Sequence, residues 1–147
     1  MELRKNTHHV YRLMYHFVWI PKYRHKVFAE PYREALKAMI GKICYDYDIE
    51  LVELEVPIDH IHRVVRTEPK ISPSDVMQII KSISAREFFR SYPSVKRKYF
   101  WGGKLWTQSY FVETIGNANE EVIRAYVQDR LKVMDKGEEN SQQLGLF

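Results

Sequence analysis

The amino-acid sequence predicts an α+β fold in which an antiparallel sheet carries helices on one face. Segments rich in β-branched and aromatic residues alternate with segments whose apolar residues recur at helical spacing. Their order is strand, helix, strand, strand, helix, strand, helix. The first six elements make the ferredoxin-like βαββαβ arrangement, and the seventh is an appended C-terminal helix.

The length and composition of the chain limit the class of protein. At 147 residues the chain is most economically one domain, large enough to bury a core without disulfides. Its single cysteine, Cys44, cannot form an internal disulfide, and its apolar helical surroundings predict a core thiol. No stretch is long and apolar enough to span a bilayer, and the first residues lack the apolar run of a signal peptide. We therefore expect a soluble, cytoplasmic protein.

The first two elements are expected between residues 11 and 47. Residues 11–20 are aromatic and apolar, and a turn-like sequence follows them, which predicts a strand. Pro31 is tolerated in the first turn of a helix, and apolar residues follow it at helical spacing. These residues are Leu36, Ile40, Ile43 and Tyr47.

A hairpin is expected next. Residues 50–56 alternate between apolar and acidic side chains, which predicts a strand with one buried face. That face is expected to hold Val52, Leu54 and Val56. Residues 61–66, after a corner at Pro57, supply the second strand of the hairpin.

The second half of the chain begins with a strong helix start. Residues 72–75 (SPSD) offer a hydroxyl cap, a proline at the first helical position and an early acid. The buried stripe of this helix is expected to be Val76, Ile79, Ile80 and Ile83. After residues 92–93 we expect a basic loop that contains Gly102 and Gly103, then a strand at 109–114 and a last helix at 117–134.

The positive charge of the chain is concentrated in two stretches. Residues 3–29 hold six Lys or Arg and residues 88–112 hold five, and neither stretch contains an acid. Both are rich in aromatic residues. Cations neutralise phosphates and aromatic faces stack on unpaired bases, so this pattern favours single-stranded nucleic acid. The alternative is a solvated basic face beside an aromatic-rich core.

Residues 59–62 (DHIH) are a candidate metal site. Side chains alternate along a strand, so His60 and His62 point to one face and Ile61 to the other. Two imidazoles at this spacing can converge on one divalent ion, but a third ligand must complete the shell. Asp59 could orient one of the rings. The alternative is a pair of exposed or hydrogen-bonded structural histidines.

The last helix offers a candidate nucleophile. Within its sequence, EVIRAYVQDRL, Tyr126 has Asp129 and Arg130 three and four residues ahead, on its own side of the helix. A phenol beside polar groups, packed over a strand with two histidines, has the parts for phosphoryl chemistry. The alternative is a core tyrosine, because Val122 and Ile123 form an apolar stripe with it.

Five blocks of sequence, in this order and spacing, carry a family resemblance. They are YRLMYHFVWIPKYRHKVF, DHIH, IIKSISAREFF, WGGKLWTQSYFVETIGN and IRAYV. Over about residues 9–131 the chain resembles the single-tyrosine HUH transposases of the insertion-sequence 200 and 605 group, often called TnpA. The resemblance implies that His60 and His62 are metal ligands and that Tyr126 is the nucleophile.

The resemblance also implies a reaction and partners. In this family a Mg²⁺ or Mn²⁺ ion polarises the scissile phosphate of single-stranded DNA, and the tyrosine forms a 5′-phosphotyrosine. Members are homodimers, and the tyrosine helix of one chain can complete the histidine site of the other. They recognise imperfect DNA hairpins at the ends of the mobile element through basic surface. The candidates here are Lys22, Arg24, Lys81, Arg86, Lys96, Arg97, Lys98 and Lys104.

The chain departs from the family pattern at the third metal ligand. A glutamine is expected four residues after the tyrosine, where this chain has Arg130, which has no acceptor and cannot bind a cation. Our hypothesis is that Asp129 replaces it, because Gln128 faces away from Tyr126. Pro57-Ile58 and Arg63 are further departures, the latter at a position that is usually apolar.

These departures keep two alternatives to a transposase open. One is a catalytically degenerate module of the same fold that still binds DNA hairpins. The other is an RNA-binding ferredoxin-like module, but this would need exposed aromatic residues on the middle strands. The predicted hairpin at residues 50–66 offers histidine and glutamate there instead.

The end of the chain is expected to lie outside the domain. We expect residues 1–135 to form the HUH transposase domain and residues 136–147 a flexible tail. The final QLGLF resembles the pentapeptide by which bacterial DNA-metabolism proteins dock on the replication sliding clamp. Its contact residues would be Gln143, Leu144, Leu146 and Phe147. The alternative is that the tail folds back on its own domain, since exposed apolar side chains are unfavourable in water.

Overall fold

The central element of the protein is a four-stranded antiparallel sheet. The computed structural model describes residues 4–5, 10–11, 13–115, 125 and 128–129. The strands of the sheet are β3 (Met14–Trp19), β4 (Glu50–Glu55), β5 (Ile61–Arg66) and β6 (Phe111–Thr114). They lie in the order β4-β5-β3-β6, and every neighbouring pair is antiparallel. This is the ferredoxin-like order that the sequence predicts.

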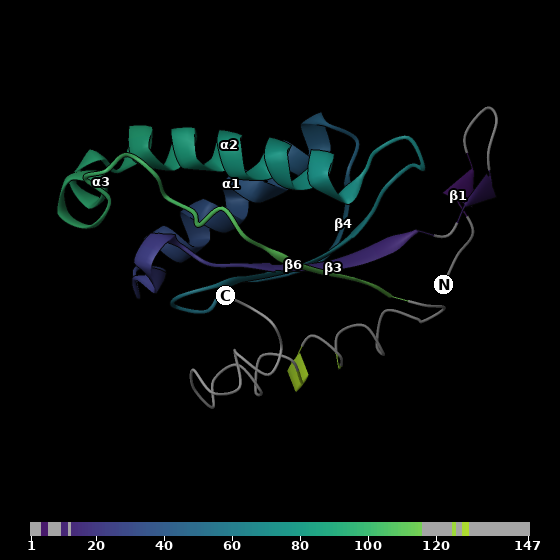
Figure 1. Ribbon diagram of the computed structural model, residues 1–147, viewed down its shortest axis with the longest axis horizontal. Helices are drawn as coiled ribbons and strands as arrows, with labels where there is room; N and C mark the ends of the chain where they lie inside the picture. Colours follow the sequence, from purple (N-terminus) through teal and green to yellow (C-terminus); the bar gives the residue numbers. More distant parts are fainter. Residues whose placement is uncertain (1–3, 6–9, 12, 116–124, 126–127, 130–147) are drawn as a thin grey trace.

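Two long helices cover one face of this sheet. Figure 1 shows α1 (Tyr32–Asp46) and α2 (Pro73–Ser91) side by side above the strands. A short 3-10 helix, η1 (Lys22–Arg24), follows β3. The strands β1 (Arg4–Lys5) and β2 (Val10–Tyr11) pair with each other in a separate small sheet, so the predicted strand at residues 11–20 is shorter than expected. In the described part of the chain, no helix has the length and apolar character needed to cross a membrane.

The basic segment after α2 is helical, so the predicted loop there is wrong at its start. Residues Pro93–Tyr99 form α3, and Pro93 stands in its first turn, where a missing N–H costs nothing. The buried side chain of Val95 anchors the helix to the core. Val95 and Tyr99 alone, in a helix of seven residues, give too short a pattern to be recognised as helical from the sequence.

The two faces of the sheet have different roles. Phe17 of β3 lies opposite Arg63 of β5, and both face the helices, where the apolar core is. Leu36, Ile40 and Ile43 of α1 and Val76, Met77 and Ile80 of α2 fill that core. Cys44 is buried there, as expected. The opposite face carries His16 beside His62, and this face positions the candidate site.

The strand β4 contains a β-bulge that the simple alternation pattern did not predict. The register shifts between Leu51 and Glu53, so Leu51 pairs with Val65 and Leu54 pairs with Arg63. Leu51 and Leu54 both pack against the core although they are three positions apart, with two residues between them. The prediction that Val52 shares the buried face is therefore wrong, because the extra residue of a bulge reverses the alternation.

The start of α2 is a complete capping box. The hydroxyl of Ser72 accepts from the Asp75 amide at 3.0 Å, and the Ser72 amide donates to the Asp75 carboxylate at 3.2 Å. Ser72→Ala should lower the free energy of unfolding by about 1 kcal/mol, measured by urea denaturation. The control is Ser82→Ala on the exposed side of the same helix, which should not destabilise. Equal stability of the two variants would contradict this account.

Candidate functional site

The two histidines of the DHIH sequence lie together at the start of β5. His60 and His62 are 1% and 0% exposed, and their ring centroids are 5.0 Å apart at an angle of 70°. His62 pairs across the sheet with Val18, and its neighbour Val64 pairs with His16. The structure therefore brings the predicted pair into contact on the face that the helices leave open.

Asp59 fixes the orientation of His60. Its carboxylate lies 2.7 Å from Nδ1 of His60 and also accepts from Nε of Arg24 at 3.2 Å. Burial alone would raise the pKa of Asp59, but the hydrogen bonds from His60 and Arg24 and the positive charge of Arg24 lower it below its ordinary value. Because a carboxylate only accepts, Nδ1 of His60 must donate, and Nε2 carries the lone pair.

Nε2 of His60 is positioned as the nitrogen of a metal-binding histidine would be. Nε2 of His60 is buried and has no hydrogen-bond partner among the described residues. A buried polar atom left unsatisfied costs about 1–3 kcal/mol, so such atoms need an explanation. A histidine held by a carboxylate at one nitrogen and open at the other is the usual arrangement of a metal ligand. The residues present thus fit a divalent ion.

His62 is held by a third histidine that the sequence analysis missed. Nδ1 of His62 lies 2.9 Å from Nε2 of His16, and Nδ1 of His16 lies 3.3 Å from a carboxylate oxygen of Glu113. The rings of His16 and His62 stack with centroids 5.1 Å apart. His16 is 46 residues from His62 in the sequence, and only the register of β3 against β5 and β6 brings the three side chains together.

The structure does not place the predicted nucleophile and the predicted third ligand beside the histidines. Tyr126 and Arg130 lie outside the described residues. Asp129 is helical and exposed. Among the described residues, no group of three His, Cys, Asp or Glu side chains is placed to bind a metal ion. The substitution of Asp129 for the missing glutamine therefore stays a prediction.

Two of the predicted DNA contacts, Arg24 and Lys81, make hydrogen bonds within the protein. Arg24 bonds to Asp59, as described above. Lys81 donates to the backbone carbonyls of Thr107 and Ser109, and burial lowers the pKa of Lys81 to about 8. Lys81 thus ties α2 to the segment before β6.

The other predicted contacts include four exposed side chains on and after α3. They are Lys96, Arg97, Lys98 and Lys104. Lys96 lies over the ring of Phe89, Lys98 over the ring of Tyr99, and Lys22, at the other basic stretch, over Tyr23. The role of these cations in DNA binding stays a prediction.

The aromatic residues of the basic stretches divide into two groups. Six of them are buried in the core, as the alternative explanation of their abundance expects. These are Phe17, Trp19, Phe28, Phe88, Phe100 and Trp106. Tyr23 and Trp101 instead expose 69% and 81% of their surface. They are the aromatic faces that a base could stack on in these two stretches.

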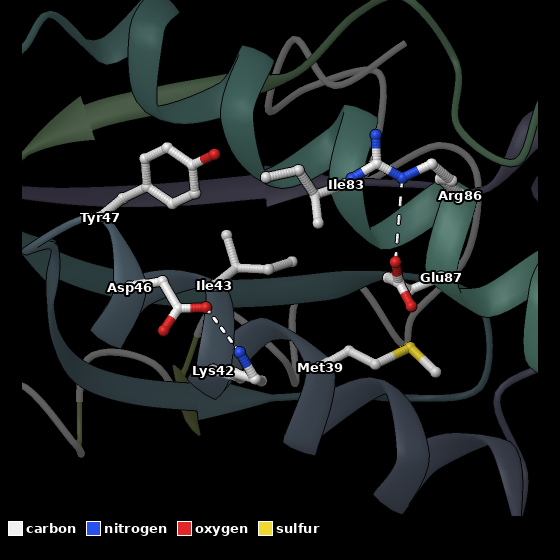
Figure 2. A pocket seen from close by; sticks show the side chains of 8 residues that line it. All are labelled: Met39, Lys42, Ile43, Asp46, Tyr47, Ile83, Arg86 and Glu87. Carbon is white, nitrogen blue, oxygen red and sulfur yellow. Dashed lines mark hydrogen bonds and ion pairs between the residues drawn. The ribbon is translucent and has the colours of Figure 1, made fainter.

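A pocket of about 370 Å³ lies between α1 and α2, on the helix-covered side of the sheet (Figure 2). Its apolar lining is Met39, Ile43 and Ile83. Lys42 donates to Asp46 at 2.7 Å, and Arg86 lies 3.8 Å from Glu87. Each cation at the rim is therefore balanced by a carboxylate, which makes the pocket a poor phosphate site.

Most of the chain matches one family of known proteins. Residues 9–130 match the family described as IS200-like transposases. The chain belongs to this family. The ISDra2 transposase TnpA of Deinococcus radiodurans is 33% identical over 130 residues, which are 88% of this chain and 92% of that protein. The transposase of insertion sequence IS200 from Salmonella typhimurium is 31% identical over 135 residues, 92% of this chain and 88% of its own.

Solved structures of transposases share the fold. A candidate transposase from Deinococcus radiodurans, solved by crystallography, superposes with a TM-score of 0.71 and 34% identity, over 86% of this transposase and 96% of that chain. A REP-associated tyrosine transposase bound to a REP hairpin superposes with a TM-score of 0.56 and 17% identity, over 84% of this chain and 67% of its own. The second likeness concerns the fold alone. Together they confirm the predicted ferredoxin-like architecture.

Proposed function

We propose that this transposase cuts and rejoins single-stranded DNA at hairpin-marked ends of a mobile element, through a 5′-phosphotyrosine at Tyr126. The observation that carries the proposal is the buried Nε2 of His60, which Asp59 holds in ligand form beside His62. A pair of merely structural histidines would be expected to satisfy both ring nitrogens.

The proposed chemistry consists of two transesterifications. The phenolic oxygen of Tyr126 forms a bond to the scissile phosphorus, and the bond from phosphorus to the 3′ oxygen breaks. That oxygen leaves with a proton as a 3′-hydroxyl. Another 3′-hydroxyl then attacks the phosphotyrosine, joins the new ends and releases Tyr126. Each step exchanges one phosphate ester for another, so no ATP is needed.

His60 and His62 would hold a Mg²⁺ or Mn²⁺ ion through their Nε2 atoms. When bound, the cation would polarise the phosphate oxygens and neutralise charge that develops on them. Two neutral imidazoles bind such ions weakly, so a third protein oxygen is required. Asp129 is our candidate, either in the same chain or from the partner in a homodimer.

The exposed cations on and after α3 support hairpin recognition, and a neighbour that shares the fold is bound to a REP hairpin. Cations contribute to such binding by releasing counterions from the phosphate backbone. Docking of the tail on the sliding clamp stays a prediction. Its residues 143–147 lie outside the described part of the chain.

A labelled single-stranded oligonucleotide that contains an element end tests the proposed function. With Mn²⁺ present, the protein should form a covalent adduct with the 5′ phosphate side and release a 3′-hydroxyl fragment. Tyr126→Phe should bind the oligonucleotide but form no adduct. The matched control is Tyr45→Phe, which changes a tyrosine that is 84% exposed on α1 and should react normally.

The second candidate function is a hairpin-binding module without cleavage. Two observations favour it: Arg130 occupies the position of the usual ligand, and Asp129 is exposed. Tight hairpin binding with no adduct from the native protein, under any of several divalent ions, would support this module and overturn the transesterification proposal.

A further inference from the structure

A line of three side chains connects the surface of the sheet with His62. Glu113 of β6 contacts His16 of β3, and His16 contacts His62 of β5, so each member comes from a different strand. His16 and His62 are completely buried, and the side chain of Glu113 is 27% exposed. The register of the sheet sets this line, because His16 pairs directly with Glu113 and with Val64.

Glu113, at the exposed end of this line, determines which nitrogen of each histidine donates and which accepts. A carboxylate oxygen accepts hydrogen bonds and cannot donate, so Nδ1 of His16 must carry the proton that Glu113 accepts. In a neutral imidazole the other nitrogen is then an acceptor. Nε2 of His16 therefore accepts from Nδ1 of His62, which fixes the proton of His62 on Nδ1. Nε2 of His62 is left with its lone pair.

The same result holds for His60 by a shorter route, since Asp59 accepts from its Nδ1 directly. Both rings are thus set in the tautomer whose Nε2 can bind a cation. Without such a partner, a neutral imidazole in solution exchanges its proton between the two nitrogens. A ring that is protonated on Nε2 cannot bind a cation through that nitrogen.

We propose that His16 is a positioning residue of this transposase: with Glu113 it holds His62 in the Nδ1-protonated tautomer that a divalent cation requires. This inference rests on the proposed function for the role of the cation. The tautomer itself is a property of the metal-free protein.

Two substitutions of His16 separate its hydrogen bond from its bulk. His16→Leu replaces the ring with an apolar side chain of similar size, which offers no acceptor for His62. His16→Gln keeps an acceptor, because its amide oxygen can take the bond from His62 while its amide nitrogen donates to Glu113. The control is His25→Leu, since the ring of His25 packs against Tyr99 and Phe100.

The first test is a nitrogen-15 NMR spectrum of the histidine rings in metal-free native protein, with His62 assigned through His62→Gln. We expect His62 to be protonated on Nδ1 and bare on Nε2. In His16→Leu the proton should move in large part to Nε2, and in His16→Gln it should stay on Nδ1. A native His62 protonated on Nε2 would overturn the proposal without any variant.

The second test is Mn²⁺ affinity by calorimetry. His16→Leu should bind about 10- to 100-fold more weakly, the range measured for loss of an orienting partner, and His16→Gln should recover most of that loss. His25→Leu should match the native protein. Native affinity in a folded His16→Leu would overturn the positioning role. If the native protein forms no DNA adduct, the proposed function fails, while the ring spectrum still decides on its own whether His16 sets the tautomer of His62.

Discussion

His60→Ala and His62→Ala should each abolish adduct formation with single-stranded DNA and weaken Mn²⁺ binding. The loss should be at least the roughly 100-fold that follows removal of an orienting partner, because these variants remove the ligand itself. Hairpin binding in the presence of EDTA should stay close to native. This binding is expected to depend on the exposed cations on and after α3, which neither variant changes. Calorimetry and a gel-shift assay measure the two quantities.

The two histidine variants also need a control for folding, because both rings are buried. A cooperative thermal transition, together with retained hairpin binding, shows that each variant has folded. His60→Ala or His62→Ala protein that still forms the adduct at the native rate would show that these rings do not take part in the reaction.

Arg63→Met should stabilise the protein by about 2 kcal/mol, within the range measured when a buried charged group is replaced by an apolar one. Arg63 is 0% exposed, and its three side-chain nitrogens have no hydrogen-bond partner among the described residues. Burial lowers the pKa of Arg63 to about 10, and the nearby Cys44 thiol offsets this only in part. A buried charge beside a neutral thiol is costly, and methionine fills similar space without that charge.

The lowered pKa of Arg63 determines the pH range in which its burial destabilises the protein. The folded pKa of Arg63 lies below that of the unfolded chain, so folding disfavours the charged form. The cost is therefore fully present at pH 7 and would be relieved only as the pH rises above about 10. Urea denaturation at pH 7 should show the gain in stability.

Arg33→Met is the matched control for Arg63→Met. The guanidinium of Arg33 donates to the carbonyl of Val56 at 2.8 Å, so its removal should destabilise the protein or leave its stability unchanged. A lower free energy of unfolding for Arg63→Met than for the native protein would mean that the guanidinium stabilises the core.

The architecture could be predicted from the sequence because its signals are local. The capping box at Ser72 and the helical spacing that follows Pro31 each depend on a few neighbouring residues, and the structure confirms both helices. The bulge at Leu51 and Glu53 could not be predicted in this way. It depends on how β4 aligns with β5, which the β4 sequence alone does not determine.

In the candidate site, too, only contacts between residues close in the sequence could be predicted. His60 and His62 are two residues apart, so strand alternation is enough to place them together. His16 and Glu113 belong to distant strands, and only the register of three strands makes them partners of His62. Arg24 was expected to contact DNA, yet it bonds to Asp59, because the fold of η1 brings it there.

We propose that Tyr126 attacks a phosphate next to His60 and His62. The most direct test is mass spectrometry of peptides from native protein that has reacted with a single-stranded element end and Mn²⁺. We predict a nucleotide attached through its 5′ phosphate to the peptide that contains Tyr126, and no such peptide from His60→Ala. A nucleotide on another tyrosine, or unmodified peptides from protein that binds the hairpin tightly, would contradict the claim.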